Sequence, residues 1–318
     1  RAIPVTGTPV ENHLLDLWAL ADVAIPGLLG SREWFEMQFP DTEQSARALA
    51  EVTNPIILKR QVRDVAQDLP ERIDVDVPLE LGPVLAREYE AVRQETLERY
   101  PKAGAMVATG QLQLYCAHPL LRTSEIPSDG WEDRVMLSGR LQSPLSTPKL
   151  ERTVDLLQEA FANGKKVLVF ANFNACGPIL RESARSLPEA FWGAINGSTP
   201  QNDRQATVDR FSEQEGPAVL ILNPRAAGTG LNITAATVVI HYTQVWNPAL
   251  ELQASARAHR RGQTQPVTVY HMFYVDTVEE VMMERAQRRR ELGAEAVPTS
   301  SQDDVDLRRA MSLSPVNP

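Results

Sequence analysis

Short, almost continuously apolar runs alternate with helical patterns through the second half of the chain. Four such runs predict buried strands: residues 166–170, 218–222, 237–240 and 267–270. Between them, apolar positions recur at helical spacing, as at 150–161 and 179–187. Strands that are apolar on both faces and alternate with helices are typical of a parallel sheet with helices on both faces. The pattern therefore predicts an α/β fold.

The first half of the chain follows a different pattern. Residues 12–20 have the spacing of an amphipathic helix, and residues 26–58 favour a small helical outgrowth. Apolar and charged side chains alternate at 73–77, as in a half-buried strand. The helical period returns over 85–121, and a Ser- and Pro-rich stretch at 124–147 predicts a long surface loop. We expect the helices to be insertions around the sheet.

Composition narrows the class of protein. The chain has 318 residues, of which 43% are hydrophobic, enough to bury a core in one or two domains. Its net charge of −9 argues against a protein that coats nucleic acid, so any DNA contact should be a local patch. Cys116 and Cys176 lie far apart and predict neither a zinc site nor a disulfide. No apolar stretch is long enough to span a bilayer, and without a signal peptide we expect a cytoplasmic location.

The most informative stretch begins with Trp-Asn-Pro at 246–248 and ends with Gln-Ala-x-x-Arg-Ala-x-Arg-x-Gly-Gln at 253–263. Asn247 suits a helix N-cap, and Gly262 suits the position just past a helix end, so the pattern predicts one short helix. Three polar side chains share one face of it: Gln253, Arg257 and Arg260. Two neighbouring guanidiniums repel unless an anion lies between them. A solvated basic face is the alternative interpretation.

This stretch of sequence resembles the sixth helicase motif of the Swi/Snf-type DNA-dependent ATPases, a branch of helicase superfamily two. The resemblance implies a second RecA-like lobe in which Arg257 and Arg260 are arginine fingers that point at ATP bound on the first lobe. Gln253 would complete the site, and Gln263 would help to close the lobe interface. ATP and Mg²⁺ would be the cofactors of a full-length parent protein.

The N-terminal stretch resembles a second motif of the same family. Thr-Gly-Thr-Pro at 6–9 is weak evidence alone, but with the helix that follows it resembles motif three, the last part of the first lobe. Thr6 is thereby a candidate DNA contact, while Glu11 stands where the family commonly has Gln. The predicted domains are a first-lobe tail with a helical protrusion at 1–60, a second RecA-like lobe at 61–292 with a helical insertion at about 84–145, and a loosely packed or disordered tail at 293–318.

Two polar loops resemble further motifs of the second lobe. The turn at 196–200 resembles the family's Asp-Gly-Ser-Thr segment, with Asn196 in place of Asp. Residues 225–236 resemble motif five, in which small residues let the backbone approach phosphate. Gly228 and Gly230 are candidates for binding nucleotide. The candidate DNA-backbone contacts in these two loops are Ser198, Thr199, Arg204, Thr229 and Asn232.

The chain contains no Gly-x-x-x-x-Gly-Lys-Ser/Thr sequence, which holds the β- and γ-phosphates in P-loop ATPases. We therefore expect the C-terminal motor half of an ATP-dependent double-stranded DNA translocase, which alone binds no nucleotide and is inactive. Its partners would be the DNA backbone, the first lobe of the same polypeptide and the proteins of any larger complex, with no metal and no membrane.

Two other classes of protein stay open at this point. A non-catalytic DNA- or partner-binding module would keep the fold without the activity. The predicted sheet and the arginines are also consistent with an RNA helicase of superfamily two, but the motif that begins with Trp-Asn-Pro is not. Heavy use of Ala and Arg suggests a bacterial source, in which transcription, repair and anti-phage defence are all open roles.

Overall fold

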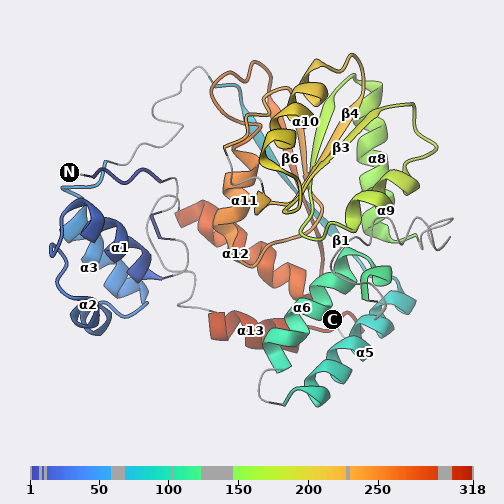
Figure 1. Ribbon diagram of the computed structural model, residues 1–318. Helices are drawn as coiled ribbons and strands as arrows, with labels where there is room; N and C mark the ends of the chain where they lie inside the picture. Colours follow the sequence, from blue (N-terminus) through green and yellow to red (C-terminus); the bar gives the residue numbers. More distant parts are fainter. Residues whose placement is uncertain are drawn as a thin grey trace.

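The computed structural model describes residues 2–6, 9–10, 13–58, 69–101, 104–122, 146–226, 230–292 and 303–316. Within them, six parallel strands form one sheet in the order β1-β6-β5-β2-β4-β3 (Figure 1). The strands are β1 (Arg72–Leu79), β2 (Lys166–Phe170), β3 (Phe191–Ile195), β4 (Ala218–Leu222), β5 (Val238–His241) and β6 (Val267–Tyr274). The predicted parallel α/β sheet is confirmed.

The burial of each strand follows from its place in the sheet. β4 and β5 are interior strands and are buried along their whole lengths. β1 is an edge strand, so Val75 and Val77 are only half-buried and Ile73 is 41% exposed. β6 runs to Tyr274, beyond the predicted run at 267–270, because it pairs with β1 over that strand's full length.

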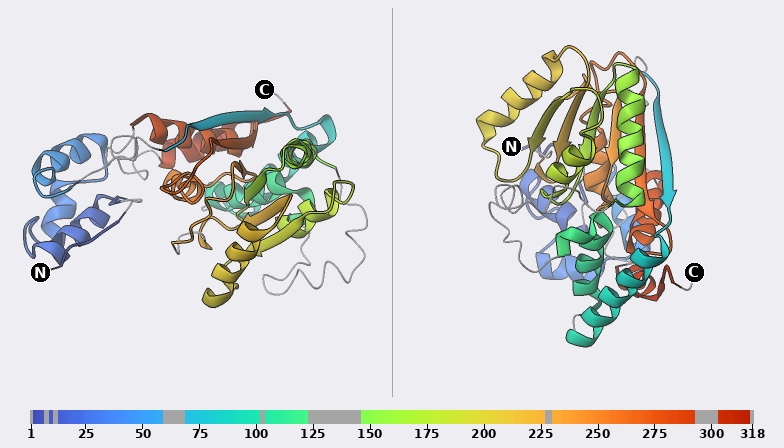
Figure 2. Two further views of the ribbon diagram at one scale, coloured as in Figure 1. Left: turned by 90° about the horizontal axis from the view of Figure 1, so that it is seen from above. Right: turned by 90° about the vertical axis from the view of Figure 1, so that its right-hand side faces the viewer.

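Helices cover both faces of the sheet (Figures 1 and 2). On one face α8 (Pro148–Ala162) and α9 (Cys176–Ser183) pack against a core that includes Val167 and Val169. On the other face α10 (Gln201–Glu213) and α11 (Pro248–Ser255) pack against a core that includes Leu168 and Phe170. The side chains of successive residues of β2 therefore pack into opposite cores, as expected for a strand whose side chains alternate in direction.

A helical layer lies beyond one end of the sheet. It contains α5 (Pro83–Arg99), α6 (Gly104–Ala117) and the 3₁₀ turn η1 (Pro119–Arg122), which occupy the described part of the predicted insertion. Of these elements, α5 and α6 share an apolar cluster with α12 (Val278–Leu292) and α13 (Asp303–Ser312). The predicted surface loop at 124–147 lies almost entirely outside the described residues.

The tail expected to be loose contains a packed helix, α13. Ala310 is fully buried in it, and Asp306 is only 4% exposed. Arg285 of α12 donates to Asp303 at 2.6 Å and to Asp306 at 2.5 Å, and its guanidinium lies 4.5 Å from the centre of the Trp246 ring. The polar composition suggested disorder, but these charges are paired. α13 is therefore fastened to the start of the Trp-Asn-Pro segment.

The N-terminal helices form a separate small core. They are α1 (Leu14–Ala24), α2 (Arg32–Gln38) and α3 (Glu43–Thr53), which pack through Leu14, Leu17, Phe35 and Leu49. In Figures 1 and 2 they stand to one side of the sheet, on the same side as α11 and α12. Among the described residues, no helix has the length and apolar character needed to span a membrane.

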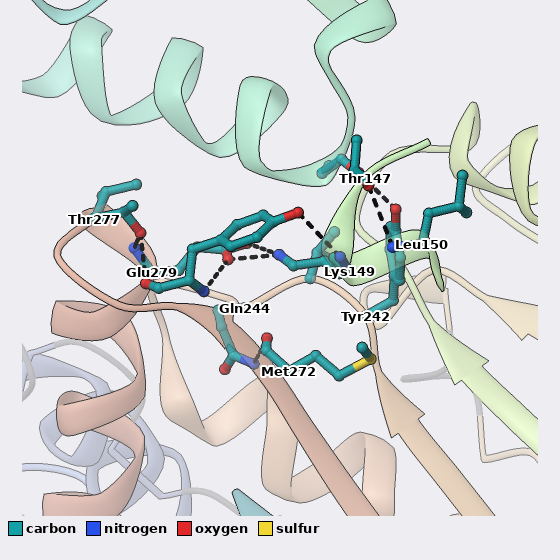
Figure 3. Close-up of polar contacts among 12 residues, drawn as sticks. Thr147, Lys149, Leu150, Tyr242, Gln244, Met272, Thr277 and Glu279 are labelled. Carbon is teal, nitrogen blue, oxygen red and sulfur yellow. Dashed lines mark hydrogen bonds and ion pairs between the residues drawn. The ribbon is translucent and has the colours of Figure 1, made fainter. Parts of the chain in front are cut away.

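A buried ion pair joins α8 to α12 beside the end of β6 (Figure 3). The Nζ of Lys149 lies 2.6 and 2.5 Å from the two carboxylate oxygens of Glu279, and the two side chains are 0% and 2% exposed. The ammonium lies 4.6 Å from the centre of the Tyr274 ring. Beside it, the Tyr242 hydroxyl donates to the carbonyl of Ala117 in α6 at 2.7 Å. The start of α8, the start of α12 and the insertion therefore meet at one polar centre.

Candidate functional site

The helix predicted from Asn247 to Gly262 is shorter in the structure. Asn247 is its N-cap, because the side-chain oxygen accepts from the backbone N–H of Ala249 at 3.0 Å. The helix, however, ends at Ser255, so Arg257 and Arg260 lie in the turns that follow it. The expectation that both arginines sit on a helix was therefore wrong.

Hydrogen bonds from other parts of the chain hold the turns that follow α11. The carbonyl of Arg257 accepts from the N–H of Ile233 at 3.0 Å, and that of Ala258 accepts from the side-chain amide of Gln263 at 3.2 Å. A continuing helix would need these oxygens for donors four residues further on. Gly262 then turns the chain with a φ of 100°, a left-handed conformation that favours glycine.

Arg257 and Arg260 form a pair of neighbouring positive charges. Both side chains are half-buried. Burial, and then the positive charge of Arg260, lower the pKa of the Arg257 guanidinium below its ordinary value. In the part of the chain that the structure describes, the buried Nε of Arg257 has no hydrogen-bond partner. An anion placed against this pair would relieve the repulsion and fill the open donor position.

Gln263 ties the arginine turns to the neighbouring loop. Its side chain is buried, and the amide nitrogen donates to the carbonyls of Thr234 and Ala236 at 3.0 Å each. We expected this residue to help close an interface between lobes. Its amide instead points into the protein and holds the loop at residues 234–236 against the arginine turns.

The motif-five loop is described only in part. Gly228 and Thr229 lie outside the described residues, whereas Gly230 has a φ of 82° and Asn232 is exposed. Arg260 lies against this loop, with its guanidinium 3.5 Å from the carbonyl of Leu231. The loop and the arginine turns are therefore adjacent. Gln253 sits half-buried on α11, one turn before Arg257.

The turn after β3 is organised by Asn196. Its side-chain oxygen accepts from the N–H of Ser198 at 2.9 Å and from the Ser198 hydroxyl at 2.6 Å. The Thr199 hydroxyl accepts from the N–H of Asn196 at 3.0 Å, and the Nε of Arg204 donates to the carbonyl of Thr199 at 2.9 Å. Asn supplies the acceptor that Asp would. Arg204 thus braces the turn, and a direct contact to DNA by it stays a prediction.

A groove opens at the carboxyl ends of β2, β3 and β4. Its volume is about 670 Å³, and its lining includes Asn174, Asn196 and Asn223. The ends of β3 and β4 are adjacent, because the N–H of Asn223 donates to the carbonyl of Ile195 at 3.0 Å. The predicted turn at Asn196 and the loop after Asn223 therefore share one edge of the sheet. Thr6 lies elsewhere, exposed on the segment that leads to α1.

The sequence reasoning missed the polar residues that follow β2. The side-chain amide of Asn172 donates to the carbonyl of Gln244 at 2.7 Å, and that of Asn223 donates to the carbonyl of Asn172 at 2.8 Å. These bonds connect the ends of β2, β4 and β5. The sequence could have identified these residues, because each is an asparagine soon after a buried strand, at the edge where parallel sheets bind their ligands.

Comparison with known proteins supports this reading of the motifs. A family model of the SNF2-related domain matches residues 1–120, and a model of the helicase conserved C-terminal domain matches residues 148–262. The Zorya protein ZorD of Escherichia coli is 34% identical over 342 residues, which cover 96% of this chain and 30% of that protein. An uncharacterized ATP-dependent helicase of Mycoplasma pneumoniae is 31% identical over 91% of this chain and 27% of its own length. The chain therefore spans about a third or less of these relatives.

A solved structure resembles almost the whole chain. The SWI2/SNF2 ATPase core of Sulfolobus solfataricus, solved in complex with double-stranded DNA, is 27% identical and covers 97% of this chain and 66% of its own, with a TM-score of 0.58. The parallel sheet is accordingly RecA-like. Since sequence and fold agree over nearly all of its length, this chain belongs to the Swi/Snf-type family of helicase-like ATPases.

Proposed function

We propose that the chain is the C-terminal motor half of an ATP-dependent translocase on double-stranded DNA, with Arg257 and Arg260 as its arginine fingers. The observation that carries the proposal is the half-buried arginine pair, in which the buried Nε of Arg257 has no partner among the described residues. A phosphoryl group in transfer carries the negative charge that such a pair would stabilise. Gln253, on the preceding turn, would complete the site.

The first lobe of the same polypeptide would supply the remaining parts. ATP and Mg²⁺ would be held there, since P-loop ATPases hold phosphates and metal with residues that this sequence does not contain. Closure of the two lobes would bring Arg257 and Arg260 to the γ-phosphate, and Gly228 and Gly230 would let the neighbouring loop approach the nucleotide. The position of α11 on the same side of the sheet as α1–α3 supports this arrangement (Figure 1).

The carboxyl edge of the sheet would hold one strand of DNA. The candidate contacts are Ser198, Thr199, Thr229 and Asn232, with Arg204 bracing the first turn and Thr6 contributing from the first-lobe segment. These side chains are mostly neutral hydrogen-bonding groups, which suit phosphate oxygens and read no base edges. The double-stranded DNA in the Sulfolobus solfataricus complex supports duplex DNA as the partner.

We expect the purified chain by itself to hydrolyse no ATP, because nothing in it would cradle the phosphates. Joined to the first lobe of its own polypeptide, it should show turnover that duplex DNA stimulates without strand separation. A phosphate-release assay with and without duplex DNA measures both. DNA-stimulated turnover by the chain alone, retained after repeated purification, would contradict the division of labour between the lobes.

DNA binding by the chain should depend only weakly on salt. Each neutralised phosphate contributes roughly −0.9 to the slope of log affinity against log salt concentration, and a patch of this composition can engage about two to four phosphates. Fluorescence anisotropy with two unrelated duplexes should give similar affinities and shallow slopes. A steep slope or a preference for one duplex would favour a dedicated binding module, and a preference for RNA would favour an RNA helicase lobe.

A further inference from the structure

A cluster of four titratable side chains, three of them buried, lies beneath α11, outside the site described above. Its members are His271 on β6, His241 on β5, Asp74 on β1 and Glu251 on α11. The His271 side chain is 0% exposed and that of Glu251 4%. A carboxylate so deeply buried is costly unless a positive charge neutralises it. The cluster therefore requires an account of how Glu251 is balanced.

Three of these side chains are close enough to one another to suggest a metal site. Donor atoms of His241, Glu251 and His271 all lie within 4.8 Å of each other. However, the two imidazole rings are stacked with an interplanar angle of 3°. The lone pairs of an imidazole lie in its ring plane, so two parallel rings cannot both point at one ion. Moreover, each nitrogen of His271 already faces a carboxylate.

The geometry around His271 is that of an imidazolium between two carboxylates. Its Nε2 lies 2.8 Å from an oxygen of Asp74, and its Nδ1 lies 2.9 Å from an oxygen of Glu251. The Nε2 contact is a hydrogen bond, whereas the Nδ1 contact is a close charge–charge approach without hydrogen-bond alignment. An imidazolium at this position would balance the two carboxylates. Burial acts to raise the pKa of Asp74, but hydrogen bonds from His271 and Arg72 outweigh it and hold that pKa well below its usual range.

The charges then alternate in a row from the sheet edge to α11. Arg72 binds Asp74 through two nitrogens at 2.9 and 2.7 Å, Asp74 faces His271, and His271 faces Glu251. His241 stacks on His271 as a neutral ring, because burial lowers its pKa to about 3. Its Nε2 lies 2.7 Å from the hydroxyl of Ser255, the last residue of α11. Both histidines therefore hold the helix that leads into Arg257.

We propose that His271 is a positioning residue of the ATPase, a buried cation that locks Glu251 and so fixes where α11 presents Arg257 and Arg260. This inference rests on the proposed role of the two arginines. Without the cation, Glu251 would lose the positive charge 2.9 Å from its carboxylate, on a helix that leads directly into the arginine turns. The helix would relax away from the sheet, and the guanidiniums would move with it. Displacements on the scale of 1 Å at a reacting centre can reduce turnover by about 10²-fold.

The test uses the full-length polypeptide and the variants His271→Gln, Glu251→Gln and His271→Arg. We expect the two glutamine variants to lose about 10²-fold in kcat while KM for ATP stays within about threefold, because first-lobe contacts bind the nucleotide. Arginine offers donors to both carboxylates and keeps its charge, so His271→Arg should recover most of the turnover. Glu251→Gln tests the same lock if a change at His271 prevents folding.

A matched control separates positioning from a loss of stability. Leu157→Ala removes a buried side chain from the core on the opposite face of the sheet and lowers the unfolding midpoint without touching α11. Assayed below its midpoint, it should keep the wild-type kcat. If His271→Gln and Glu251→Gln turn over at the wild-type rate, or lose no more kcat than Leu157→Ala, the inference is overturned. The proposed role of the two arginines can fail separately. If it is wrong, Arg257→Ala will leave turnover intact.

Discussion

If the proposed function holds, replacing Arg257 or Arg260 by alanine in the full-length polypeptide should reduce kcat for ATP hydrolysis by about 10³–10⁵-fold, the range for an arginine that stabilises a phosphoryl transition state. Nucleotide affinity should change by less than about one order of magnitude, because the contact acts mainly in the transition state. Arg257→Lys should restore little, since an ammonium cannot reproduce the planar fork of a guanidinium. Steady-state kinetics with saturating duplex DNA, together with equilibrium nucleotide binding, measure both quantities.

Arg261 provides the matched control for this experiment. It follows Arg260 directly, it is exposed, and it is not part of the proposed site. Arg261→Ala should therefore stay within about threefold of the wild-type rate while changing the net charge by the same amount. Wild-type turnover by both the Arg257→Ala and Arg260→Ala variants would contradict the arginine-finger role. It would favour a solvated basic face for this segment and a binding module for the chain.

Replacing Lys149 by methionine should lower the free energy of unfolding by about 3–5 kcal/mol, the usual cost of breaking a buried ion pair by removing one partner. The loss arises because Glu279, 2% exposed, would keep a buried charge with no ammonium beside it. Its carboxylate also accepts from the N–H of Tyr274 at 3.0 Å, so it cannot easily move to solvent. Chemical denaturation of the isolated chain, followed by circular dichroism, measures the change.

The double variant Lys149→Met, Glu279→Gln should recover much of that stability. It removes both charges and keeps a side-chain oxygen for Tyr274, and uncharged replacements of buried pairs are often nearly neutral. Arg152→Met on the same helix is the control, because Arg152 pairs with Glu159 at 3.4 Å where the side chains are 36% and 60% exposed. It should cost at most about 1 kcal/mol. Equal losses for Lys149→Met and Arg152→Met would contradict a stabilising role for the buried centre.

Several features of this protein could be predicted from local sequence because their causes are local. The buried strands follow from runs of apolar residues, and their parallel arrangement follows from the helical segments between them. The start of α11 follows from Asn247 and Pro248, which satisfy a helix N-terminus without help from other elements. The arginine pair could be recognised for a similar reason, because the sequence motif at residues 246–263 is specific to one family.

Other features depend on partners that lie far away along the chain. The turns that follow α11 are held by hydrogen bonds from Ile233 and Gln263 to the carbonyls of Arg257 and Ala258. The tail forms α13 because its aspartates meet Arg285 and Arg288 of α12. Neither result could be predicted from neighbouring residues alone. The local sequence predicts a longer helix for the first segment and a loosely packed tail for the second.

The sequence by itself thus determined five of the six described strands, though not β3, together with the order of the motifs and the pair of arginines. Periodicity, capping and family motifs can all be recognised within short stretches of sequence. Only the tertiary structure decided which charges that are distant in sequence meet. Lys149 and Glu279 are 130 positions apart, and Asp74 and His271 are 197 apart. Each of these residues looks like an ordinary surface charge in its own segment. Packing of the strands and helices removes water from around Lys149, Glu279 and His271, and a charge buried in this way is stable only where its partner has been brought against it.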